Sequence, residues 1–137
     1  MKLEVEISEC SCLKCSQMCH APCCGTPEDF KKLIDAGYAE RLMYDNLPGG
    51  SHMLKPSLKG YEGKMSPWHV LSSDGCTFWV NGLCELHSTG LKPTSGKLAH
   101  HSLSEQKYKQ TEEYVNDSWG DRKGTEVIER WKKITGN

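Results

Sequence analysis

The residues best suited to chemistry in this 137-residue chain are its eight cysteines, which fall into two groups. Six of them lie between Cys10 and Cys24, at irregular spacings that match neither a helical nor a strand period. The other two, Cys76 and Cys84, lie far downstream, in a segment that also carries His87. Thiolate and imidazole groups are the usual ligands of structural zinc. We therefore predict that the two groups meet in the fold and bind metal.

Spacing within the two groups is typical of a metal site, and zinc is the leading hypothesis. A structural zinc ion takes four ligands in a tetrahedron, and two of them commonly come from one C-x-x-C turn. Cys12 and Cys15 form such a turn, and Cys84 stands at the same spacing from His87. Because the candidates outnumber the ligands of one ion, we expect more than one metal atom, in two separate sites or in one cluster. The predicted metal ligands are Cys10, Cys12, Cys15, Cys19, Cys23, Cys24, Cys76, Cys84 and His87.

Two other interpretations of the cysteines are open. Iron or an iron–sulfur cluster suits four thiolates as well as zinc does, and it would give the protein a redox or electron-transfer role. A disulfide framework would instead imply an extracellular protein. Residues 1–10 alternate charged and apolar side chains and lack the apolar stretch of a signal peptide, which favours a cytoplasmic protein. In that reducing compartment, clustered cysteines bind metal more often than they form disulfides.

The remaining histidines are secondary candidates. His100 and His101 precede a predicted helix, and one of them could ligate metal or relay protons. We expect His20 to lie outside the ligand shell, although it is within the cysteine-rich segment. His52 and His69 have no partner at ligand spacing, so we expect them to be exposed or hydrogen-bonded.

Composition limits the class of protein. A chain of this length fits one domain, and only 36% of its residues are hydrophobic, so its core should be thin and a bound metal would help to stabilise it. The 17 basic and 18 acidic residues are spread without long runs, which argues against binding to nucleic acid. No segment is apolar for long enough to span a membrane. GxSxG, P-loop, GxGxxG and HExxH motifs are absent, which makes an enzyme the less favoured class.

A third function to weigh is an adaptor whose zinc-built surface binds another protein or RNA. Its support is a pair of predicted C-terminal helices with a basic run from Arg130 to Lys133. Cations at the C-terminus of a helix also complement the helix dipole, and this simpler explanation is the favoured one.

Hydrophobic periodicity predicts an α+β fold with one β-hairpin and about four short helices. Residues 3–7 alternate in the manner of an edge strand. Thr26 is suited to cap a helix that begins at Pro27 and ends at Gly37. A second short helix is predicted over residues 38–44.

The middle of the chain is rich in glycine and proline, with short strands predicted over residues 52–54 and 69–71. Asn81-Gly82 is the preferred pair for a two-residue type I′ turn. It predicts a hairpin of residues 77–80 and 83–86.

The C-terminal part predicts one loop and two helices. Residues 91–96 contain a proline and a glycine and are expected to form a loop. Ser102 followed by Glu105 matches a capping box for a helix that continues to Gly120. A final helix is expected to begin near Thr125.

The segment Cys12-x-x-Cys15-x-x-Met18-Cys19 resembles the CxxCxxCC motif of a family of small bacterial zinc- or iron-chelating proteins, the YkgJ-like proteins. Met18 stands where the family has the first of its two adjacent cysteines. The resemblance implies metal chelation, with zinc or iron as the metal and no reaction common to the family.

The resemblance continues downstream. Cys76-Thr-Phe-Trp and Cys84-Glu-Leu-His match a later element of the family, and Lys92-Pro93 resembles its Arg-Pro, although no cysteine follows here. The resemblance covers about residues 10–101. With the chain length, which predicts a single metal-binding domain over residues 1–137, it implies a family-like core over 1–101 and a C-terminal helical extension over 102–137.

Overall fold

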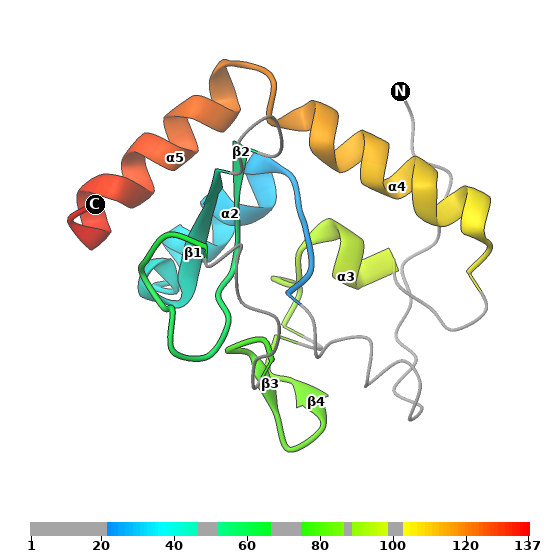
Figure 1. Cartoon of the computed structure of the whole chain (residues 1–137), viewed down its shortest axis with the longest axis horizontal. Coiled ribbons are helices and arrows are strands. Elements are labelled where there is room, and N and C mark those ends of the chain that lie inside the picture. The colour runs from blue at the N-terminus through cyan, green and yellow to red at the C-terminus, as the bar shows by residue number, and fades with distance from the viewer. Residues whose placement is uncertain (1–21, 47–51, 67–74, 87–88, 99–102) are drawn as a thin grey trace.

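One helix, four short strands and three further helices follow one another along the part of the chain that the structure, a computed structural model, describes: residues 22–46, 52–66, 75–86, 89–98 and 103–137. Within these residues there are four α-helices and two antiparallel two-stranded sheets, which confirms the predicted α+β class (Figure 1). The predicted strand over residues 3–7 lies outside them. The elements follow in the order α2 (Pro27–Asp35), the 3₁₀ turn η1 (Ala39–Arg41), β1 (Leu42–Asn46), β2 (His52–Pro56), β3 (Trp79–Val80), β4 (Leu83–Cys84), α3 (Thr94–Leu98), α4 (Glu105–Ser118) and α5 (Arg122–Thr135).

Helix α2 begins at the predicted residue because its first turn satisfies its own backbone donors. The Thr26 hydroxyl accepts a hydrogen bond from the Asp29 amide, and the Asp29 carboxylate accepts one from the Thr26 amide, which is a capping box. Gly37, with a φ of 93°, turns the chain after the helix. Phe30 and Leu33 are buried, as their helical spacing predicts. The predicted start and end of this helix are confirmed.

The helix predicted over residues 38–44 is wrong, because residues 42–44 belong to strand β1, which pairs with another strand. Only the turn η1 is helical, and β1 then runs antiparallel to β2, which confirms the strand predicted over 52–54. In β1 the backbone N–H and C=O groups form hydrogen bonds to β2, whereas in a helix they would bond within the segment. Tertiary context therefore overrides the local helical pattern. The strand predicted over 69–71 lies outside the described residues. The register pairs Leu42 with Pro56, Met43 with Lys55, Tyr44 with Leu54 and Asp45 with Met53.

The predicted hairpin around Asn81 and Gly82 is confirmed, although its ladder is shorter than expected. Both turn residues have positive φ, 52° and 79°, as a type I′ turn requires. Only β3 and β4 pair as strands, and one further bond runs from the Glu85 amide to the Phe78 carbonyl. A ladder this short is not stable alone, so the hairpin needs ties to the rest of the protein.

Helix α3 occupies part of the segment predicted to be a loop over residues 91–96. Its first residue, Thr94, donates from both its amide and its hydroxyl to the Asp29 carboxylate. The Lys97 amide then bonds to the Pro93 carbonyl. No local pattern in the sequence predicts this helix, because its anchor, Asp29, lies far away along the chain.

The two C-terminal helices form, but each begins at a different residue from the one predicted. Helix α4 is capped by Ser104, whose hydroxyl accepts a bond from a backbone amide in the first turn; the predicted cap, Ser102, lies outside the described residues. Helix α5 is capped by Asp121 and so begins before Thr125. Asp and Ser are both strong N-caps, and one such residue stands immediately before each helix.

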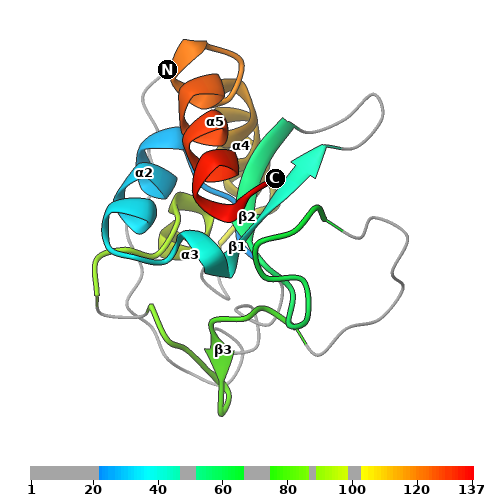
Figure 2. The same cartoon turned by 90° about the vertical axis from the view of Figure 1, so that its left-hand side faces the viewer.

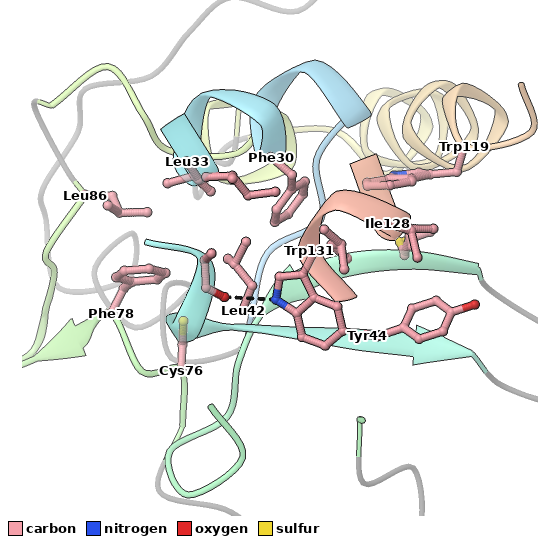
Figure 3. Close-up of a cluster of buried hydrophobic side chains, with 14 residues drawn as sticks. Phe30, Leu33, Leu42, Tyr44, Cys76, Phe78, Leu86, Trp119, Ile128 and Trp131 are labelled. Atoms are coloured by element: carbon pink, nitrogen blue, oxygen red, sulfur yellow. Dashed lines mark hydrogen bonds between the residues drawn. The ribbon is translucent and has the colours of Figure 1, made fainter. Parts of the chain in front are cut away.

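The core lies between α2, α5 and the β1–β2 sheet (Figures 2 and 3). Trp131 of α5 is fully buried, and its indole N–H donates to the Ala39 carbonyl over 2.9 Å. Trp119, which follows α4, is also buried, and its ring centre lies 5.7 Å from that of Phe30. The C-terminal helices therefore supply side chains to the same core as α2 and the sheet.

Replacing Trp131 by Phe should lower the free energy of unfolding by about 1–3 kcal/mol, because the Ala39 carbonyl would lose its buried donor. Ile134→Ala in the same helix is the control. Ile134 is 47% exposed, so this change should alter the value by less than about 0.5 kcal/mol. Urea unfolding followed by circular dichroism measures both. Equal destabilisation by the two changes would contradict the role given to Trp131.

Candidate metal centre

One cavity, of about 270 Å³, is lined by cysteines from both groups in the sequence. Cys23 and Cys24 lie just before α2, whereas Cys76 precedes β3 and Cys84 lies in β4. These residues come from segments far apart along the chain, and they border a common space.

Hydrogen bonds at successive residues fix the segment that carries Cys23 and Cys24. The Cys24 carbonyl accepts a bond from the Ser95 amide of α3 over 2.8 Å. The next carbonyl, that of Gly25, accepts a bond from the Trp119 indole over 2.7 Å. The backbone beside the two thiols is thus held by α3 on one side and by a buried tryptophan on the other.

The Asp29 carboxylate joins this segment to α3. It is only 8% exposed, and its Oδ2 accepts bonds from the Thr26 amide and the Thr94 amide, each 2.9 Å long, and from the Thr94 hydroxyl. A buried carboxylate is stable only where such donors replace water. The same group therefore caps α2 and holds the first residue of α3.

Two glycines allow the close packing around this half of the cavity. A Cβ atom at Gly25 would come within 2.7 Å of the Pro93 Cβ. A Cβ atom at Gly96 would come within 2.8 Å of the Cys23 Sγ. Both distances are too short for non-bonded atoms, so the absence of a side chain is what lets the Cys23 thiol lie against α3.

Arg41 fixes the other half of the cavity, residues 76–86 with their hairpin. Its guanidinium forms an ion pair with Glu85, donates to the Thr77 carbonyl over 2.9 Å, and lies 4.4 Å from the centre of the Phe78 ring. The planar fork of arginine can make these contacts together, whereas lysine offers only a point charge. The hairpin is thereby tied to the junction of η1 and β1.

Cys76 is the most deeply buried of the described cysteines. It is 4% exposed and belongs to the core cluster, on the same side of it as Phe78 and Leu86 (Figure 3). Cys84 lies directly opposite Trp79 in the β3–β4 ladder, and the Trp79 amide in turn donates to the Cys76 carbonyl. The backbone of the hairpin thus links the two residues.

A buried ion pair interacts with the Cys24 thiol. Lys55 Nζ lies 2.7 Å from the Asp45 carboxylate, which is 3% exposed. Burial raises the pKa of Cys24, against the opposing effect of the Lys55 charge. Burial acts to lower the pKa of Lys55, but Cys24 and Asp45 together outweigh it and raise that pKa. Without metal, Cys24 is therefore a neutral thiol near pH 7.

The described cysteines do not make a complete metal site by themselves. Within the part of the chain that the structure describes, no three His, Cys, Asp or Glu side chains are grouped so as to hold a metal ion. A zinc ion needs four ligands, so further donors would be required. The other predicted ligands lie outside the described residues: Cys10, Cys12, Cys15, Cys19 and His87.

Most of the secondary histidine candidates also lie outside the described residues. These are His20, His69, His100 and His101. His52 is exposed, and its Nδ1 shares a hydrogen bond with the Tyr44 hydroxyl, as expected for a histidine without a ligand role.

Three charged residues near the thiols were not among the predicted site residues. Asp45 and Lys55 meet only because β1 pairs with β2, and no local pattern in the sequence signals that pairing. Lys92 lines the cavity, and its side chain packs beside Gly96 and Cys23. In the sequence it stood out only through the Lys92-Pro93 pair of the family resemblance.

Comparison with known proteins does not extend this description. No protein-family model, curated protein or solved structure matches the chain. The resemblance of its cysteine pattern to the CxxCxxCC family therefore stays a prediction. Among the described helices, none has the length and apolar character needed to cross a membrane.

Replacing Arg41 by Lys should loosen the cavity on its hairpin side, because the contacts to Glu85 and to the Thr77 carbonyl cannot both be kept. The Glu85 amide should then exchange with deuterium about tenfold faster, equivalent to about 1.4 kcal/mol of local stability. Arg130→Lys is the matched control, since Arg130 forms an exposed ion pair with Asp35. If both changes left the Glu85 amide unaffected, Arg41 would not be the anchor of the hairpin.

Proposed function

We propose that the protein binds zinc through its two cysteine groups and that the metal chiefly stabilises the fold. The observation that carries this proposal is the cavity lined by Cys23, Cys24, Cys76 and Cys84. Thiolate sulfur is a soft ligand that zinc accepts readily, and a set of thiols from distant segments is suited to a cross-linking metal.

The proposal assigns the remaining ligands to the rest of the first cysteine group and to His87 of the second segment. Cys12, Cys15 and Cys19 are the leading candidates, and Cys10 and His87 are further ones. With eight thiols in the chain, the proposal includes more than one metal atom. Each ligand set would draw on both groups, so that the metal joins the segment before α2 to the hairpin.

A structural role suits the construction of this protein. Only 36% of the residues are hydrophobic, and the hairpin that carries Cys84 pairs through only two residues in each strand. Bound zinc supplies a cross-link and no redox chemistry of its own. The proposal includes a reducing cytoplasmic setting, in which thiols stay available to a metal.

Metal removal tests the structural role. The protein as purified should contain at least stoichiometric zinc, and exhaustive chelation should lower its melting temperature by about 10 °C, because metal that binds only the folded state stabilises it. Elemental analysis and thermal unfolding by circular dichroism measure the two quantities. An unchanged melting temperature in metal-free protein would contradict the role. A brown, sulfide-containing protein after anaerobic purification would replace zinc by an iron–sulfur cluster.

Serine substitutions test whether both halves of the cavity hold the metal. Cys23→Ser and Cys84→Ser should each weaken zinc binding by more than about tenfold, because each removes a thiolate from a different half. Ser95→Ala changes a lining residue without a thiol and serves as the control. Competition with a chromophoric chelator gives the affinities. Full zinc affinity in Cys84→Ser would exclude the hairpin from the site.

A further inference from the structure

The thiol-lined cavity is larger than a metal ion needs. A zinc ion bound to sulfur at about 2.3 Å lies between its ligands and adds little volume of its own. The cavity of about 270 Å³ has room for roughly ten non-hydrogen atoms. This is the size of a small organic molecule.

Most of the wall that is not thiol is apolar. Its apolar side chains come from the segment before α2, from the end of β2, from residues 76–86, from α3 and from the segment before α4. Phe78 and Leu86 are each 1% exposed and belong to the core, so this part of the wall is firmly packed. Such a wall favours an apolar ligand body, because binding removes apolar surface from water. The apolar lining residues are Pro22, Pro56, Phe78, Leu86, Leu98 and Leu103.

The described lining carries two charged side chains, Lys92 and Glu112, and they differ in their surroundings. Glu112 is exposed and is hydrogen-bonded by the Tyr108 hydroxyl one turn earlier in α4. Lys92 is partly buried, packs against Gly96, and has no ion-pair partner among the described residues. A lysine side chain that lines an apolar cavity and forms no ion pair with a described residue can attract an anionic group.

From these observations we propose that the cavity binds a small carboxylic acid with an apolar body, whose carboxylate pairs with Lys92. The apolar body lies against the wall that includes Phe78 and Leu86. This inference goes beyond the proposed function and does not depend on it, because the apolar wall and Lys92 belong to the chain itself and not to a bound metal.

Calorimetric titration of the full chain with octanoate tests the proposal. Octanoate has an apolar chain and one carboxylate, and it should bind with a stoichiometry of one. Octanol and octylammonium have the same chain with a neutral and a cationic end, and they should bind about tenfold more weakly because neither can pair with Lys92.

Substitution of Lys92 identifies the source of this preference. Lys92→Met keeps an apolar stem but removes the charge, and it should weaken octanoate binding about tenfold while leaving octanol binding unchanged. Lys97→Met is the matched control, since Lys97 lies on α3 but does not line the cavity. If Lys92→Met does not fold, as judged by its melting curve, Lys92→Gln provides the same comparison.

Several outcomes would overturn the proposal. These are no binding of octanoate at millimolar concentration, equal affinity for octanoate and octanol, or unchanged octanoate affinity in the folded Lys92 variants. A change in the visible absorption of cobalt-substituted protein on adding octanoate would assign the carboxylate to the metal, which overturns this proposal but supports metal binding. Octanoate binding that requires Lys92, in a protein that takes up no zinc, would support this inference while the proposed function fails.

Discussion

Two charged side chains, Asp29 and Arg41, hold the segments that bring cysteines to one cavity, and the site depends on them more than on any regular element. Residues 22–26 and 76–86 contain little secondary structure, so their backbone groups need partners elsewhere. The Asp29 carboxylate accepts donors from Thr26 in the first of these segments and from Thr94 of α3. Arg41 donates to a backbone carbonyl of the second segment and pairs with its Glu85. Hydrogen bonds of ionised groups are stronger than neutral ones, which suits them to this task.

These two anchors work because the elements that carry them are themselves fixed by the core. Asp29 lies on α2 next to Phe30, which is buried in the core. Arg41 is the last residue of η1 and immediately precedes β1. Trp119 contributes both to the core and to the cavity wall segment. Its ring packs near Phe30, and its indole N–H donates a hydrogen bond to the Gly25 carbonyl. The core and the cavity therefore share contacts, so a substitution in one should also alter the packing of the other.

Local features of this fold could be predicted from the sequence, whereas features built by distant partners could not. The N-cap at Thr26 and the turn at Asn81 are decided within a few residues, and both predictions are confirmed. The segment 38–44 has a helical pattern, but its partner strand decides its structure. In the site, the cysteines that line the cavity could be predicted, because a cysteine is recognised from its residue type alone. The contacts of the two anchors and of Lys92 could not be predicted, because charged residues are common on any surface and only the fold shows what they touch.

Chain connectivity gives a reason why a metal would join these particular segments. Cys23 and Cys84 line one cavity, yet most of the described core elements lie between them in sequence. In the chain-entropy view, a cross-link that closes a loop of this length lowers the conformational entropy of the unfolded chain. This stabilises the folded state by about 4 kcal/mol. A cross-link within Cys76–Cys84 would close only a short loop and gain less. The hairpin of this protein has only two paired residues in each strand, and few of its residues are hydrophobic. A cross-link between the segment before α2 and the hairpin would therefore stabilise the fold more than one within the hairpin.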